Sequence, residues 1–231
     1  MRAIVKVGPI LVSALALLAA CGGEEAAAPI PTATPETSGP LENAAESSAA
    51  NVAFVLGCGA PFTPDATPTT LAAAFGRENV VPETIDGPEG EPMNVTAIYP
   101  NDPERRIEVS FANEEERTDL VAVIVRDHAS QWKSPGGYSF GDGIDVVEKA
   151  NGRPFAISGF GWDFGGFAVD WKNGQLKETG GCATTVRFSP DAPDVAPGIQ
   201  GDGVTPLSND PVVRKAQPKV SMFGIGWAKN R

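Results

Sequence analysis

The chain has little of the side-chain chemistry that most enzyme and metal sites use. Its 231 residues include one histidine and three cysteines. Asp127, His128 and Ser130 are near neighbours on one segment, whereas a catalytic triad brings its groups together from different elements. Neither Cys58 nor Cys182 has a His or Cys neighbour at zinc-ligand spacing, and no P-loop, GxSxG or dinucleotide motif occurs in context. The sequence therefore predicts no enzyme, no metal site and no cofactor.

Positive charge is also scarce. The chain carries 18 Lys and Arg against 29 Asp and Glu, which gives a net charge of −11. Nucleic-acid binding needs a basic patch that releases counterions, and adsorption to an anionic membrane needs a similar excess of positive charge. The charge balance argues against both for the folded part. The 26 Gly and 21 Pro instead favour short strands joined by many turns.

The N-terminal apolar run is too short to span a bilayer as a mature helix. Residues 10–20 are apolar apart from Ser13, and a short basic region precedes them. This pattern is typical of a secretory signal. The run ends in Leu18-Ala19-Ala20-Cys21, which resembles the lipobox of bacterial lipoproteins. In that class the signal is removed before the cysteine, which then carries the lipid.

This resemblance implies a signal peptide at residues 1–20 and lipidation at Cys21, with palmitate-type acyl chains as the membrane anchor. Each buried CH₂ adds about 0.8 kcal/mol, so several chains hold a protein firmly. The implied location is the bacterial cell envelope. Gly22 is not the Asp associated with inner-membrane retention in enteric bacteria, which favours the outer membrane, facing the periplasm. An ordinary signal peptide with a chance cysteine is the alternative.

Residues 22–50 consist mainly of Ala, Glu, Pro, Thr and Ser, so they cannot bury enough apolar surface to fold. Residues 21–50 are therefore expected to be a lipid anchor followed by a disordered linker. With Cys21 assigned to the lipid, Cys58 and Cys182 remain as one pair in an oxidising compartment. A disulfide between them would close a loop of about 124 residues. Two free thiols are the alternative.

Residues 51–231 are expected to form a single globular domain. Thr67, Pro68 and Gly76 are typical of the cap, first turn and end of a helix. A second helix is expected at 142–152 and a third at 209–215. Alternating or apolar patterns predict strands at 94–99, 106–111, 120–125, 155–157, 167–171, 183–188 and 220–225, with an Asn173-Gly174 hairpin after 167–171.

Two local matches recur at nearly one offset. Phe75-Gly76-Arg77 and Asn151-Gly152-Arg153 lie 76 residues apart, and Val109–Phe111 and Val186–Phe188 lie 77 apart. A repeated offset indicates duplication. The predicted fold is α+β, with two helix-plus-antiparallel-sheet units in tandem at about 51–128 and 129–231. Together they form one sheet-rich domain with short helices.

The stretch from Gly159 to Gly166 stands out near the middle of the folded part. It holds four glycines, three aromatic residues and one carboxylate. Glycines permit close backbone approach, and aromatic side chains supply large contact areas. One interpretation is a core cluster at a bulged hairpin. The other is a patch that contacts a partner, comprising Phe160, Trp162, Asp163, Phe164 and Trp171.

The segment Tyr138–Pro154 resembles the small SmpA/OmlA-type lipoproteins, in which a short helix and Gly-x-Pro precede a three-stranded sheet. Two such units in tandem resemble the β-lactamase-inhibitor protein fold. The first resemblance implies protein scaffolding at the outer membrane, and the second implies a concave sheet that binds another protein. No inhibitory residue transfers by motif.

The leading functional prediction is a membrane-anchored envelope lipoprotein that acts as a protein-binding or scaffolding module without catalysis. Its expected partners are the membrane, through the N-terminal lipid, and an envelope protein or cell-wall component. The alternative is a small hydrolase or glycan-binding domain that uses carboxylates in the sheet cleft, because the many acidic residues offer numerous pairs.

Overall fold

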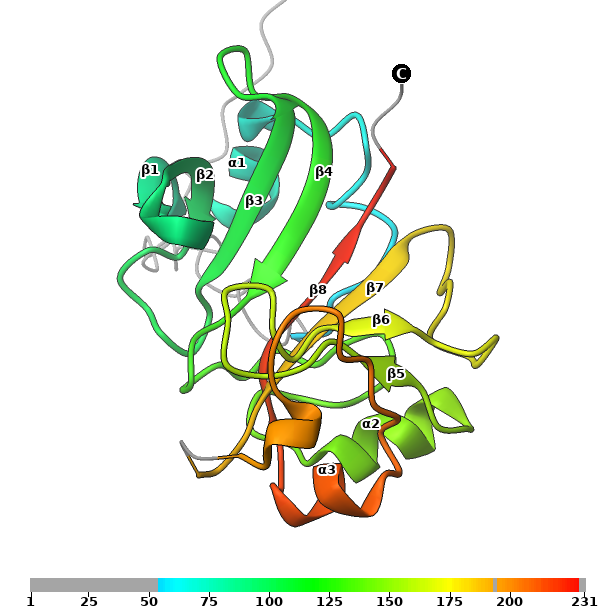
Figure 1. Cartoon of the computed structure of the whole chain (residues 1–231). Coiled ribbons are helices and arrows are strands. Elements are labelled where there is room, and N and C mark those ends of the chain that lie inside the picture. Colours follow the sequence, from blue (N-terminus) through cyan, green and yellow to red (C-terminus); the bar gives the residue numbers. More distant parts are fainter. Residues whose placement is uncertain (1–53, 193–194, 229–231) are drawn as a thin grey trace, which may run out of the picture. The chain divides into compact units, whose positions relative to one another are not determined.

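The computed structural model describes residues 54–192 and 195–228, which belong to the compact unit at residues 50–231 (Figure 1). The expected signal peptide, Cys21 and the whole of the expected linker lie outside them. The helices are α1 (Pro68–Phe75), α2 (Ile144–Asn151) and α3 (Pro211–Lys215). The strands are β1 (Val80–Asp86), β2 (Pro92–Ile98), β3 (Ile107–Asn113), β4 (Thr118–Val125), β5 (Ala156–Ile157), β6 (Ala168–Asp170), β7 (Ala183–Ser189) and β8 (Lys219–Gly226).

The helices begin and end within two residues of the bounds that the sequence indicates. Thr67 and Thr70 form a reciprocal capping box at the start of α1, and Gly76 ends that helix. Gly152 ends α2 in the left-handed conformation, where glycine carries no steric penalty. Asp210 caps α3 by accepting a 2.7 Å hydrogen bond from the Val212 amide. These three short helices are thus explained by local sequence.

The strands form a six-stranded antiparallel sheet in the order β1-β2-β3-β4-β8-β7 and a two-stranded sheet of β5 and β6. A bridge between Phe167 and Arg187 links the smaller sheet to β7. Each half of the domain is therefore a helix followed by four strands, and the two halves join where β4 pairs with β8. This arrangement confirms the α+β fold of two helix-plus-sheet units.

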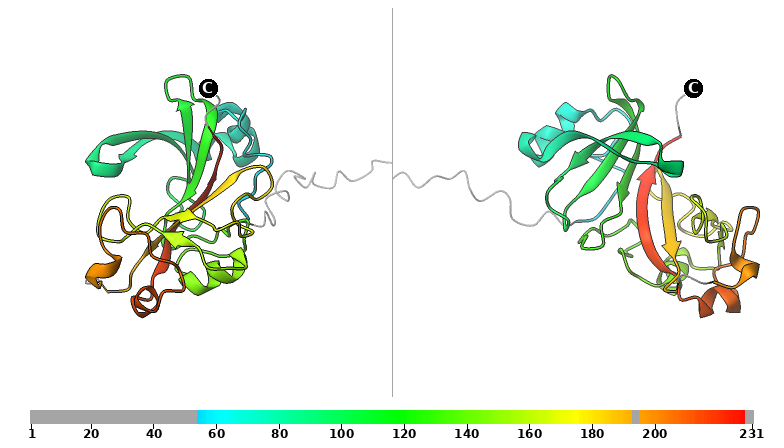
Figure 2. Two further views of the ribbon diagram at one scale, coloured as in Figure 1. Left: turned by 45° about the vertical axis from the view of Figure 1, so that its right-hand side comes forward. Right: turned by 60° about the vertical axis from the view of Figure 1, so that its left-hand side comes forward.

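One face of the six-stranded sheet and all three helices share a continuous hydrophobic core. Leu71 of α1, Val147 of α2 and Val213 of α3 are fully or almost fully buried there. The opposite face of the sheet, here called the mixed face, carries both polar and apolar side chains. In Figure 2 the β1–β2 hairpin curves away from β4 and β8, and residues of its turn line a cavity with residues of β4 and β7. The turn therefore reaches over the mixed face.

The two cysteines of the folded part lie together. Their sulfur atoms are within bonding distance and their Cα atoms are 5.5 Å apart, as in a disulfide. Cys58 precedes α1 and Cys182 directly precedes β7. The predicted pair thus links the start of the first unit to the sheet of the second.

The predicted Asn173-Gly174 hairpin is wrong. The turn runs from Trp171 to Gly174, whose amide donates to the Trp171 carbonyl over 2.8 Å. The following residues do not return along β6, because Asn151 at the end of α2 binds the next two amides and Leu176 is buried. Tertiary contacts therefore override the local turn signal.

Strand β1 was not expected from the sequence. It is an edge strand whose Pro82 lacks an amide donor, and its side chains are half-buried or exposed throughout. Without a regular apolar face, its sequence carries little strand signal.

Candidate functional site

The Gly159–Gly166 segment, here called the aromatic loop, connects β5 to β6 and is held by backbone hydrogen bonds. The Gly159 amide donates to the Val204 carbonyl over 2.7 Å, and the Phe160 amide donates to the Ile199 carbonyl over 2.8 Å. At the far end, the Phe188 amide donates to the Gly166 carbonyl over 2.8 Å. The loop is thus fixed to two separate segments of the second unit.

Glycine is required where this loop meets β7. Gly166 has a φ of 79°, and a Cβ at this position would overlap the Phe188 carbonyl oxygen. Any other residue would be strained by its backbone angle and would push the loop off the strand. The high glycine content therefore allows the aromatic loop to lie directly on the sheet edge.

The structure divides the five residues of the predicted contact patch into two groups. Phe160 is 3% exposed and Trp171 is 8% exposed, and both belong to the hydrophobic core. The prediction that these two face a partner is wrong, because their side chains are buried in the core, where Trp171 packs on Phe155 with ring centroids 5.0 Å apart. Trp162 is half-buried, Asp163 is exposed, and Phe164 is 44% exposed.

The outward-facing part of the aromatic loop borders a hollow of about 460 Å³, here called the apolar groove. Trp162 and Phe164 pack edge to face with ring centroids 5.5 Å apart. The Trp162 indole N–H donates to the Gly159 carbonyl over 2.9 Å, so its polar group is satisfied within the loop. The remaining lining residues are Ser158, Phe167, Val169, Asp202, Gly203, Val204 and Thr205.

Asp163 points the other way, towards the first unit. Its carboxylate accepts a 3.0 Å hydrogen bond from the Glu89 amide in the β1–β2 turn. Glu89 has a φ of 58°, a left-handed backbone conformation. This contact joins two segments 74 residues apart in the sequence and connects the aromatic loop to the hairpin.

Beneath that contact lies a second cavity of about 380 Å³, here called the sheet cavity. Its floor is the mixed face of the sheet. Its other sides are the β1–β2 turn and the aromatic loop, so Phe164 and Phe167 border both the sheet cavity and the apolar groove. The floor residues are Ser110, Ala122, Ile124, Arg126, Thr185, Arg187 and Met222.

Arg187 is a half-buried cation on this floor. Its Nε donates to the Gly165 carbonyl over 2.9 Å, and its guanidinium lies 5.2 Å from the centre of the Phe167 ring. Burial lowers the pKa of Arg187, an effect that Asp163 opposes and Arg126 reinforces. Among the described residues, Arg187 makes no ion pair with a carboxylate.

A network of charges lies beside the sheet cavity. The Glu108 side chain is 5% exposed, with one oxygen 3.2 Å from Arg106 and the other 2.6 Å from the Arg126 Nε. The contact with Arg126 does not have the geometry of a hydrogen bond, so it is an ion pair only. Arg106 also binds Glu83 over 2.9 Å. The buried carboxylate of this face is thus neutralised by two arginines.

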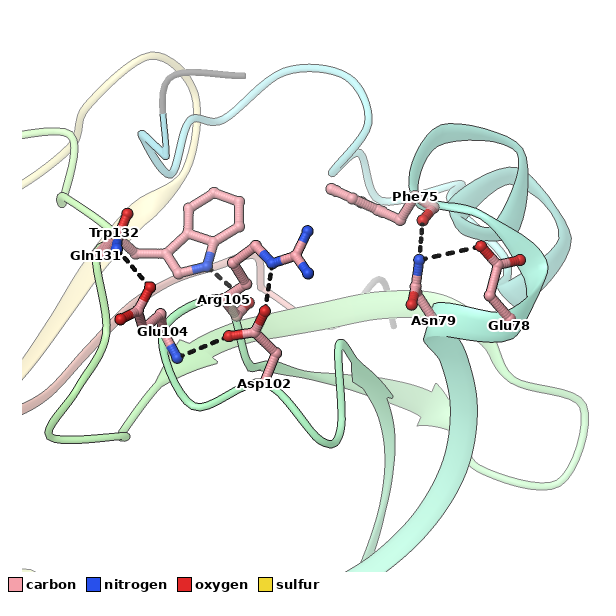
Figure 3. A network of polar contacts seen from close by, with 8 residues as sticks. All are labelled: Phe75, Glu78, Asn79, Asp102, Glu104, Arg105, Gln131 and Trp132. Atoms are coloured by element: carbon pink, nitrogen blue, oxygen red, sulfur yellow. Dashed lines mark hydrogen bonds and ion pairs between the residues drawn. The ribbon is translucent and has the colours of Figure 1, made fainter. Parts of the chain in front are cut away.

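The other residues considered from the sequence lie apart from these cavities or in the core. The His128 side chain is 88% exposed. Trp132 is buried, and its indole donates to the Arg105 carbonyl in the contacts drawn in Figure 3. The described residues contain no cluster of three or more His, Cys, Asp or Glu that could hold a metal ion.

Comparisons with family models, curated proteins and solved structures give no match for this chain. The resemblances to SmpA/OmlA-type lipoproteins and to the inhibitor fold therefore remain predictions. None of the helices within residues 54–192 and 195–228 has the length and hydropathy needed to cross a bilayer.

Proposed function

We propose that this chain is a lipid-anchored binding module of the bacterial cell envelope that takes a protein partner in the apolar groove and catalyses no reaction. The N-terminal lipobox-like sequence supports the location, with Cys21 as the anchor. The observation that carries the binding role is an aromatic pair, the half-buried Trp162 and the exposed Phe164, on a loop that is held by backbone hydrogen bonds.

The groove has the character of a protein-binding surface. Interface centres are enriched in aromatic side chains and surrounded by polar residues. A fixed loop loses little conformational entropy on binding, so contact with its rings contributes more fully to affinity. Because the Trp162 N–H is already bonded, a partner can cover the ring without leaving a buried donor unpaired.

The charge around the groove indicates the partner's chemistry. Asp202 borders the groove, and the whole chain carries a net charge of −11. A complementary partner is an envelope protein with apolar side chains flanked by Lys or Arg. The alternative of a carboxylate-based hydrolase gains no support, because Glu108 is held by two arginines.

The test places a photo-crosslinking residue at Phe164 in the full chain and, as a matched control, at Val146, which is 40% exposed on α2. We expect position 164 alone to capture one protein with a basic-flanked apolar segment. Binding of that purified partner should weaken by roughly 30-fold, or about 2 kcal/mol, in Phe164→Ala and remain unchanged in Val146→Ala.

Circular dichroism and the urea midpoint would establish that both alanine variants are folded. Equal capture at positions 164 and 146 would contradict the proposal, as would a purified partner that binds the folded Phe164→Ala protein as it binds the unmodified chain.

A further inference from the structure

We infer that the sheet cavity is a second binding site, for a small amphipathic anion that carries one carboxylate or phosphate group on a compact apolar body. This site is distinct from the apolar groove and does not depend on the protein partner proposed above. Its volume of about 380 Å³ lies at the lower end of the range for small-molecule sites.

The floor of the cavity presents positive charge in a chain that is otherwise acidic. Arg126 follows β4, and Arg187 lies on β7 opposite Met222 of β8. Both side chains point to the mixed face of the sheet, since side chains alternate along a strand. The two acidic residues that line the cavity, Asp86 and Asp163, are exposed and stand on the covering turn and loop.

The two arginines retain capacity to bind an anion. Arg187 uses Nε and Nη2 on backbone carbonyls of the aromatic loop, which leaves Nη1 available. Arg126 contacts Glu108 through Nε, so its two terminal nitrogens are available as well. Burial lowers the pKa of Arg187 and the nearby Arg126 adds to this effect, so an oxyanion beside the two groups would stabilise the charged form of Arg187.

The rest of the lining suits an apolar body with a few polar contacts. Ile124 and Met222 on the floor, with Phe164 and Phe167 at the side, provide apolar contact. Thr185 places a hydroxyl on the same face of the sheet, two residues before Arg187 on β7. This combination of apolar walls and a few convergent polar groups is typical of ligand sites.

A glycine on β8 allows an apolar side chain to pack closely on the cavity floor. Gly224 of β8 lies between Ile124 and Thr185, which pair with it from either side. A Cβ at Gly224 would overlap the Val123 carbonyl oxygen, so this position stays without a side chain. The Ile124 side chain takes up the space above Gly224, since its Cδ1 lies 2.6 Å from where that Cβ would be, and Ile124 forms the floor of the cavity there.

The test titrates the full chain in detergent with hexanoate and with hexyl phosphate, using calorimetry. Hexanol, hexylammonium and inorganic phosphate serve as separate probes. We expect binding of at least one of the two amphipathic anions, weaker binding of inorganic phosphate and hexanol, and none of hexylammonium. A preference between hexanoate and hexyl phosphate would identify the head group.

Three variants locate the site. Arg126→Gln should weaken binding at least about tenfold, which corresponds to about 1.4 kcal/mol. Thr185→Val provides a second change that leaves the loop contacts of Arg187 intact. Arg105→Gln is the matched control, because Arg105 pairs with Asp102 outside the cavity.

Several results would overturn the inference. One is that neither anion binds up to millimolar concentration. Another is that hexanol binds as well as hexanoate. The third is that the affinity is unchanged in both folded cavity variants, Arg126→Gln and Thr185→Val.

Discussion

Removal of the Cys58–Cys182 pair is expected to cost about 5 kcal/mol of folding free energy. The two cysteines are 124 residues apart. In the chain-entropy account, a cross-link of that span lowers the entropy of the unfolded chain by roughly 16 cal/mol/K, which is about 5 kcal/mol at 25 °C. Domains of this size are typically stable by about 5–15 kcal/mol. The cross-link would therefore supply a large share of the total.

Removal of the cross-link should change the entropy of the unfolded chain more than the structure of the folded one. Cys182 is 3% exposed, so alanine is the suitable replacement there, whereas the partly exposed Cys58 tolerates serine. Urea unfolding of Cys58→Ser/Cys182→Ala, compared with the unmodified chain before and after reduction, measures the loss in two independent ways. Agreement near 5 kcal/mol supports the loop-closure reasoning, and a loss below about 1 kcal/mol in both measurements would refute it.

Two further predictions concern single buried groups. Burial raises the pKa of Tyr138, so the unfolded chain ionises first as pH rises above the ordinary value of about 10. Above that pH, the free energy of unfolding should therefore decrease more steeply in the unmodified chain than in Tyr138→Phe, by up to about 1.4 kcal/mol per pH unit. Urea unfolding at pH 8 to 11 measures this difference, and parallel pH dependences of the two proteins would contradict the prediction. Glu108→Gln should lower the free energy of unfolding by about 3 kcal/mol, because it removes the buried negative charge that faces two arginines. Glu83 is more exposed, so Glu83→Gln should lower it by less than about 1 kcal/mol. Equal urea midpoints for these two variants would show that burial does not set the difference.

Local signals in the sequence were sufficient for the helices and for most strands. Thr67 caps a helix in the structure, as its position indicated. The apolar run ending at Val125 is a central strand, since β4 lies between β3 and β8. The two short matches at nearly the same spacing fall at equivalent places, since one lies at the end of each of α1 and α2 and the other lies in each of β3 and β7.

The candidate site was only partly visible in the sequence. The glycines and aromatic rings mark the aromatic loop as a candidate site, but composition does not reveal which ring points inward. Phe160 and Phe164 are identical in chemistry, yet one is 3% exposed and the other 44%. The sheet cavity was missed altogether, because Arg126 and Arg187 lie 61 positions apart and meet only through the pairing of β4, β8 and β7.

The arrangement of the two helix-plus-sheet units explains why a cavity forms at this place. The β1–β2 turn and the aromatic loop are equivalent connections, since each joins the first two strands of its unit. The two units meet in antiparallel fashion through β4 and β8, which turns one unit relative to the other. Their equivalent connections therefore approach each other across one face of the sheet, where the Glu89 amide donates to Asp163. Since only the second unit elaborates this connection with bulky aromatic residues, the same loop can close the sheet cavity on one side and present the apolar groove on the other.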